Sequence, residues 1–292
     1  MIELPLPPGV ERQVVDTPAG PVATLTAKAV TAKAVTGTAV TGTADTSQAP
    51  TVVMVSGFFG TKEDFREVLP IVAEAGYDGW AYDYPGQLGT RAGDSASSYA
   101  IPAMAAQLHQ LIQTVSPGQP AHVVGHCLGG FVARHAVLGE PALARSLTLL
   151  CCGPSMREAK HKVMLGGLKS MQKNGGTLTL WPIVKRLLAE DDTVVREFWH
   201  AKLSTMNPHF VAGAAHSMGE ETDRTEELNS AGIPSLVVHG KRDKRLWGPH
   251  AYQDMASRLN AALIVIDKAA HSPNMEQPEP TARALLDFWG PA

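Results

Sequence analysis

The chain has 292 residues, of which 44% are hydrophobic and 18% charged, and its formal net charge is −3. This length and composition are typical of one soluble domain with a large apolar core. The balanced charge, with no basic block, argues against a nucleic-acid-binding protein. No apolar run is long enough to span a bilayer, and residues 1–8 lack the features of a secretory signal, so we expect a cytoplasmic protein without a membrane partner.

The N-terminal region contains an unusual repeat. Edge strands are expected at 13–16 and from Val22 onward, but residues 26–45 form four tandem five-residue units. An odd period cannot keep one face of a strand apolar, because side chains alternate with a period of two. Residues 23–48 are therefore predicted to be a low-complexity hairpin or loop inserted before the core.

The next elements have the pattern of an α/β domain. Residues 51–55 form an apolar run typical of a buried central strand, and a loop containing Phe58 and Phe59 follows it. A second strand and turn at 80–90 contains Asp83, which we expect to brace the turn rather than to act in catalysis.

The most informative segment is a short apolar strand at 121–124 that runs into a helix at 128–138, with Gly-x-Cys-x-Gly at the bend. Glycines are needed here because the turn is too tight for neighbouring side chains. The sulfur of Cys127 would stand at the strand end beside the helix N-terminus, whose dipole favours a thiolate. The alternative is a buried structural cysteine in a strand-to-helix turn.

The other cysteines do not suggest a disulfide framework or a metal site. Three cysteines are an odd number and favour a reducing compartment. Cys151 and Cys152 end a strand at 146–150, and we expect them to be small buried residues. No Cys/His cluster has the spacing of zinc ligands, so we expect no cofactor and no metal.

The strand pattern stops between 155 and 233, and helices are predicted there. Their expected ranges are 156–172, 181–188, 192–203 and 208–218. Aromatic and methionine side chains, among them Trp181 and Phe210, make these helices apolar and adaptable. Such a segment is typical of a helical lid over a nucleophile.

Two candidate catalytic side chains follow the lid. Asp243 lies just beyond a strand at 235–240, and His271 lies just beyond a strand at 262–266. The two residues are 28 positions apart in the sequence. The alternatives are a solvated turn carboxylate, because four basic residues surround Asp243, and an ordinary loop histidine.

The tight strand-to-helix turn around Cys127, which we call the elbow, and the order of nucleophile, acid and histidine resemble the α/β-hydrolase superfamily. The resemblance extends from about Thr51 to the C-terminus, and Cys127 stands where most members carry serine. The resemblance implies an α/β-hydrolase fold with a mostly parallel central sheet flanked by helices. It also implies a helical cap after the sixth strand. The hydrolase core would comprise 1–154 and 234–292, and the cap 155–233.

The resemblance also assigns roles to residues. Cys127, His271 and Asp243 would form the catalytic triad. The backbone N–H groups of Phe58 and Leu128 would form the oxyanion hole.

Four further side chains are candidates for substrate binding: Phe59, His126, Trp181 and Phe210. Family members commonly carry histidine where this chain has Ser56. For His126 a packing role is favoured over that of a base.

The chain looks like the capped esterase, thioesterase and lactonase branch, and its elbow is similar to those of dienelactone hydrolases and polyhydroxyalkanoate synthases. An acyl-thioester intermediate favours thioesters, activated esters or lactones, so we expect a small-molecule acyl substrate, free or bound to coenzyme A or a carrier protein. An acyltransferase or cyclase that uses an amine or alcohol acceptor is an alternative. Two further alternatives are a non-hydrolytic isomerase and a binding protein on the same fold. Cys127 as an artificial replacement for a natural serine is another. The sequence does not indicate an oligomeric state.

Overall fold

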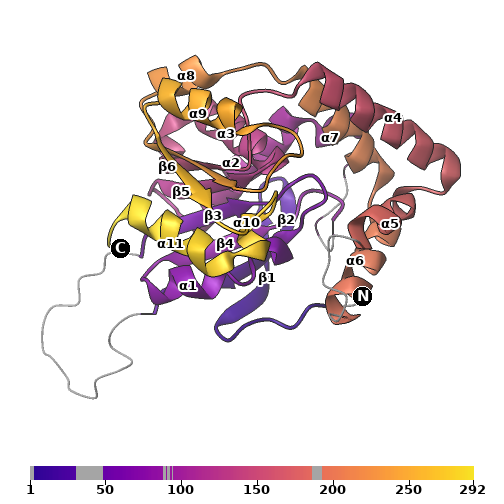
Figure 1. Cartoon of the computed structure of the whole chain (residues 1–292). Coiled ribbons are helices and arrows are strands. Elements are labelled where there is room, and N and C mark those ends of the chain that lie inside the picture. The colour runs from indigo at the N-terminus through magenta and orange to yellow at the C-terminus, as the bar shows by residue number, and fades with distance from the viewer. Residues whose placement is uncertain (1–2, 31–48, 88–89, 91–92, 94, 186–192) are drawn as a thin grey trace, which may run out of the picture.

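The computed structural model describes residues 3–30, 49–87, 90, 93, 95–185 and 193–292. A central sheet is covered by helices on both faces, and a further group of helices lies at one side (Figure 1). Among the described residues, no helix is long and apolar enough to cross a membrane.

Eight strands form the sheet in the order β1-β2-β4-β3-β5-β6-β7-β8. The strands are β1 (Val10–Thr17), β2 (Gly20–Ala27), β3 (Thr51–Val55), β4 (Asp78–Tyr82), β5 (Ala121–His126), β6 (Ala144–Leu150), β7 (Ser235–Gly240) and β8 (Ala262–Ile266). The strands from β4 to β8 pair in parallel, whereas β1 and β2 are antiparallel. The predicted α/β-hydrolase fold with a mostly parallel sheet is confirmed.

Helices cover both faces of the sheet, which explains why β3, β5 and β7 are buried along their whole lengths. One face carries α2 (Ile101–Val115), α3 (Leu128–Gly139) and α9 (Pro249–Arg258), and the other carries α1 (Leu69–Glu74) and α11 (Pro278–Trp289). Short elements complete the core: α10 (Pro273–Glu276) and the 3-10 turns η2 (Lys62–Phe65), η3 (Ala96–Tyr99) and η4 (Pro141–Leu143). Two apolar clusters fill the layers on either side of the sheet.

The segment between β6 and β7 is helical, as predicted for an insertion after the sixth strand. It contains α4 (Glu158–Asn174), η5 (Thr177–Leu180), α5 (Trp181–Val184), α6 (Thr193–Thr205), α7 (Pro208–Glu220) and α8 (Thr225–Ser230). We call it the inserted segment; α4 to α7 lie to one side of the sheet in Figure 1. The helix predicted at 181–188 ends within residues 186–192, which lie outside the described residues.

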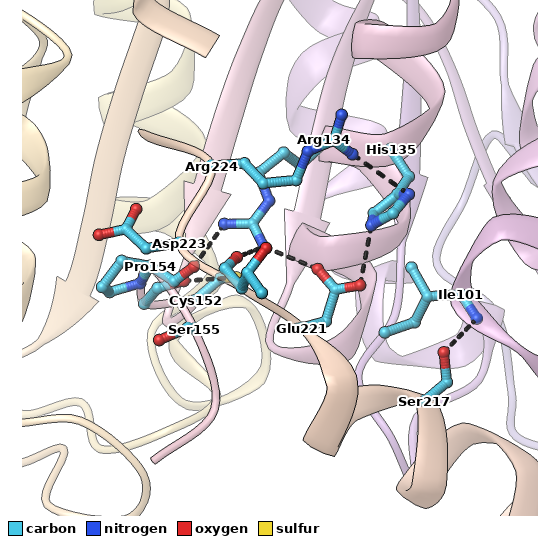
Figure 2. A network of polar contacts seen from close by, with 12 residues as sticks. Ile101, Arg134, His135, Cys152, Pro154, Ser155, Ser217, Glu221, Asp223 and Arg224 are labelled. Carbon is cyan, nitrogen blue, oxygen red and sulfur yellow. Dashed lines mark hydrogen bonds and ion pairs between the residues drawn. The ribbon is translucent and has the colours of Figure 1, made fainter. Parts of the chain in front are cut away.

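A buried polar network fixes the inserted segment to the core (Figure 2). The guanidinium of Arg134 on α3 donates to the carboxylate of Glu221 at 2.7 Å and to the carbonyl of Pro154 at 2.6 Å. His135 Nε2 donates to the other Glu221 oxygen at 2.8 Å. Burial would raise the pKa of Glu221, but the hydrogen bonds and charges of His135 and Arg134 lower it below its usual value. The end of α7 is thus tied to the helix that follows the elbow.

The predicted N-terminal insertion begins later than expected. Residues 23–27 belong to β2, which pairs with both β1 and β4 and is buried over most of its length, so they are part of the sheet. The remainder of the proposed hairpin, 31–48, lies outside the described residues.

Candidate active site

The elbow places Cys127 between β5 and α3 in a strained backbone conformation. Its φ is 51° and its ψ is −113°, a combination that non-glycine residues seldom adopt and that is characteristic of functional sites. The Cys127 N–H donates to the carbonyl of Leu150 on the neighbouring strand at 2.9 Å, which helps hold the turn. A Cβ on Gly125 would come within 2.3 Å of the Gly129 carbonyl oxygen, so the spacing of the two glycines follows from contact between backbones.

The tightness of this turn gives a prediction for two glycines of the same helix. Gly129→Ala is expected to lower the free energy of unfolding by about 1–3 kcal/mol or more, because its Cβ would lie 2.3 Å from the Val55 carbonyl oxygen. Gly139→Ala is the matched control, because nothing lies within 4 Å of its Cβ. Its stability should be unchanged or slightly raised, since alanine favours helix. Equal urea midpoints for the two variants would contradict this account of the elbow.

The loops after β7 and β8 bring Asp243 and His271 together. His271 Nδ1 donates to Asp243 Oδ2 at 2.9 Å, and the aspartate is only 2% exposed, so it is not a solvated turn carboxylate. Its oxygens also accept from the Arg245 N–H and the Tyr252 hydroxyl, each at 3.0 Å. Burial would raise the pKa of Asp243, but these hydrogen bonds and the charge of His271 lower it to about 2. The carboxylate is therefore ionised at neutral pH.

His271 is placed to exchange a proton with Cys127. Burial alone would lower the pKa of His271. The interaction with the charge of Cys127 and the hydrogen bonds to Asp243 and Cys127 outweigh burial. Together they raise the pKa of His271 to about 10. The imidazole is thus linked to the sulfur on one side and to the carboxylate on the other, the arrangement that a nucleophile, base and orienting acid require.

The loop after β3 lies against Cys127. A Cβ on Gly57 would be 3.4 Å from the Cys127 Cβ, and the turn is closed by the Gly60 N–H donating to the Gly57 carbonyl at 2.9 Å. Phe58 follows Gly57, and Leu128 is the first residue of α3, where backbone N–H groups have no partner within the helix. Both predicted oxyanion donors therefore belong to segments that border Cys127, and their donation to a substrate stays a prediction.

Asp83 has the structural role that was predicted for it. Its two carboxylate oxygens accept from the backbone N–H of Lys62 at 2.9 Å and from the Lys62 ammonium at 2.6 Å. Burial would lower the pKa of Lys62, but the charges of Asp83 and Glu63 outweigh it and raise it. This buried pair fixes the chain directly after the loop that carries Phe58.

His126 is hydrogen-bonded to the loop that carries His271. Its Nε2 lies 2.6 Å from the backbone oxygen of His271. Burial, with the charge of His271, lowers the pKa of His126 to about 3, so the ring is neutral and its Nε2–H donates to that carbonyl. A packing and positioning role fits these contacts, and substrate contact by His126 stays a prediction.

The other predicted substrate-binding side chains lie in two places. Phe210 stacks on Phe58 with 6.0 Å between ring centroids, in the same apolar cluster as Cys127. Trp181 lies in a separate cluster with two aromatic residues of α6, and its ring contacts His200 edge-on. Phe59 packs against both clusters.

Two neighbours of the His–Asp pair were not among the predicted site residues, although Cys151 directly follows a strand at the edge of the sheet that faces the site. Tyr252, which binds Asp243, stacks on His239 with centroids 4.5 Å apart and planes within 9°. Cys151 also has a positive φ, 46°, and its sulfur lies within 4.8 Å of ligand atoms of Asp243 and His271. Burial and the Asp243 charge raise the pKa of this thiol. Within the described part of the chain, this is the one group of metal-binding side chains close enough to hold an ion, and the His–Asp hydrogen bond accounts for its compactness.

Curated proteins of similar sequence include lipases and hydrolases. The chain is 24% identical over 256 residues to a monoacylglycerol lipase, abhd6-B, of Xenopus laevis, with 82% of this chain and 75% of the lipase covered. It is 26% identical over 248 residues to a putative carbamate hydrolase, RutD, of Pseudomonas savastanoi, with 82% and 93% covered.

Solved structures share the fold over nearly the whole chain. A thermophilic esterase from Thermogutta terrifontis superimposes with a TM-score of 0.74 at 20% identity, covering 96% of this chain and 98% of the esterase. An enol-lactonase from Burkholderia xenovorans gives a TM-score of 0.74 at 14% identity, covering 95% and 99%. The sequence profile described as "Alpha/beta hydrolase family" matches residues 52–284, and because this match covers more than half of the chain, the chain belongs to that family.

Proposed function

We propose that this protein is an acyl-transfer hydrolase that uses Cys127, His271 and Asp243 and passes through an acyl-thioester intermediate. At the family level, the match and the relatives support a hydrolase of esters, lactones or carbamates. The observation that carries the finer proposal is the buried chain of contacts from Cys127 through His271 to Asp243, which begins at a strained elbow residue.

The geometry suits a two-step reaction. The Cys127 sulfur attacks the acyl carbon, and the oxygen that gains negative charge is stabilised by the N–H groups of Phe58 and Leu128. His271 gives its Nε2 proton to the departing group, which leaves the acyl group on sulfur. Water then attacks the thioester while His271 accepts its proton, and the sulfur departs. Asp243 holds the Nδ1–H throughout and stabilises the imidazolium.

The sulfur nucleophile favours particular substrates. A thiolate is a better leaving group than an alkoxide, so attack on a plain oxygen ester tends to reverse. Thioesters, activated esters and strained lactones do not have this disadvantage, and they are the proposed substrate class. The apolar cluster that contains Cys127, Phe58 and Phe210 supports an apolar acyl group beside the sulfur.

Alkylation tests the nucleophile directly. Iodoacetamide is expected to label Cys127 far faster than Cys151 or Cys152, and its labelling should abolish turnover. The other two thiols are internal controls, because burial raises the pKa of both and keeps them protonated. Peptide mapping gives the three rates, and intact-mass measurement with acyl thioesters should detect an adduct on Cys127. Equal labelling of all three thiols, or full activity after modification of Cys127, would remove the proposal.

A further inference from the structure

A small cavity lies where the inserted segment meets the core. Its lining comes from the segment after the Phe58 loop, from the turn after β4 and from the end of α6: Thr61, Gly86, Gln87, Lys202, Thr205 and Met206. Its free volume is about 10 Å³, which is room for about one oxygen-sized group. Thr205 is exposed, so the cavity adjoins the protein surface at this seam.

Three polar side chains that line this cavity are buried without hydrogen-bond partners among the described residues. The atoms are Thr61 Oγ1, both amide atoms of Gln87, and the ammonium of Lys202. The residues are 0%, 4% and 3% exposed, respectively. Buried polar groups are seldom left unpaired in proteins, because each has lost its hydrogen bonds to water. Three of them around a cavity of this size indicate that one oxygen atom, of a bound water or of a ligand, completes the site.

Donors outnumber acceptors in this set. The Lys202 ammonium has three N–H donors, the Gln87 amide has two, and the Thr61 hydroxyl has one. The only dedicated acceptor is Gln87 Oε1. The missing group must therefore accept hydrogen bonds, and a hydroxyl group would in addition donate one to Gln87 Oε1.

The surrounding charges argue for a neutral ligand group. Burial lowers the pKa of Lys202, and its ammonium stands 3.8 Å above the ring of Trp199. The carboxylates of Asp64, Glu63 and Asp83 act in the opposite direction and favour the charged amine.

Lys62 is the second cation of this cluster, and it is already bound to Glu63 and Asp83 at 2.9 Å and 2.6 Å. Burial raises the pKa values of Asp64 and Asp83 to about 6, so both carboxyl groups are ionised in mildly alkaline solution. Three carboxylates against two ammonium groups leave no positive excess, so a further full negative charge is not favoured here.

We propose that Thr61, Gln87 and Lys202 bind a neutral hydroxyl or carbonyl oxygen of the acyl substrate, so that the preferred substrates are hydroxyacyl or oxoacyl compounds. This inference rests on the proposed function. Gly57, whose Cβ position touches Cys127, precedes Thr61 by four residues, so Thr61 lies at most about 14 Å from Gly57. Met206 lines the cavity and packs in the apolar cluster that contains Cys127, which links the two places.

The test uses the full chain and a matched set of small acyl thioesters of one chain length. The set comprises the plain acyl chain, chains with one hydroxyl or one keto group at each successive carbon from the third onward, and a chain ending in a carboxylate. We expect at least one hydroxy or keto member to exceed the plain chain about tenfold in kcat/KM, mainly through a lower KM, which corresponds to the added binding at this site.

Variants then assign the preference to the cavity. Lys202→Met and Gln87→Leu should each reduce the ratio between the oxygenated and plain substrates to about one. If Lys202→Met does not fold, Gln87→Leu and Thr61→Val carry the test. Lys162→Met is the control, because this lysine on α4 has a 73% exposed side chain, and it should keep the wild-type ratio.

The outcomes separate this inference from the proposed function. Turnover of the plain chain without any preference for oxygenated chains would overturn the inference and leave the hydrolase proposal standing. A preference that survives in the cavity variants, or one for the carboxylate-ended chain, would overturn it as well. Failure to turn over any member, with no adduct on Cys127, would instead refute the proposed function.

Discussion

Replacing His271 with alanine is expected to lower kcat by about three orders of magnitude or more, as for the base of a catalytic triad. His271 donates a hydrogen bond to the buried carboxylate of Asp243 and interacts with Cys127, so its loss removes proton transfer at every step. Single-turnover and steady-state rates on an activated ester or thioester provide the measurement. A wild-type rate for this variant would remove the triad from the mechanism.

Asp243→Asn is the companion variant, and it should lower kcat by less than His271→Ala does, because a thiolate needs less help from the acid than an alkoxide does.

The pH dependence of the protein follows from His271. The pKa of His271 is raised to about 10 from an ordinary value of 6.5, so its contribution to stability is complete below about pH 6.5 and is lost as the pH rises through about 10. Activity that needs the imidazolium should fall over the same upper range. In Asp243→Asn the alkaline limb of the pH–rate profile should move to lower pH, because a carboxylate that stabilises the imidazolium is gone. An unmoved limb would contradict the assignment of Asp243.

Replacing Cys127 with serine is expected to reverse the substrate preference. The wild-type protein should favour a thioester or lactone over a matched plain ester, because its thiolate is expelled more readily than an alkoxide from the tetrahedral intermediate. The serine variant should gain relative activity on the plain ester and lose it on the thioester. The ratio of kcat/KM for a matched ester and thioester, measured in both proteins, gives the result independently of the fraction of active enzyme.

The opposite outcome has a definite meaning. If the wild-type protein prefers the plain ester and serine improves every substrate alike, then sulfur is not suited to the chemistry of this site. The proposal of a cysteine enzyme would then give way to a serine-type hydrolase site in which Cys127 has replaced the nucleophile.

Most of the core could be predicted from local patterns. The predicted strand ranges 235–240 and 262–266 agree with β7 and β8. A continuous apolar run between turn residues is what β7 requires, because it is buried on both faces, whereas β8 is an edge strand with partly exposed side chains. The helix after Cys127 was placed within one residue. The extent of β2 was not predicted, because four of its residues 23–27 are alanine or threonine and the segment is held by pairing with β1 and β4.

The partners of the catalytic side chains required the tertiary structure. Tyr252 lies on a helix whose pattern indicates only which face is buried, and nothing in the pattern shows that its hydroxyl reaches Asp243. The neutral state of His126 follows from burial and from the charge of His271, which is distant in sequence. Trp181 was grouped with Phe210 by composition, but the fold puts them in different clusters.

By itself, the sequence determined the α/β-hydrolase fold, the turn at Cys127 and the order of the loops that carry Asp243 and His271, because each depends on short-range periodicity and on turn residues. Only the tertiary structure decided how Asp243 comes to be buried and bonded, and how Lys202 comes to face Thr61 and Gln87 across the seam. The physical reason is that burial and hydrogen bonding between segments distant in the chain depend on packing. Packing sets the pKa of His271 and leaves donors unpaired, whereas periodicity records only which residues turn inward.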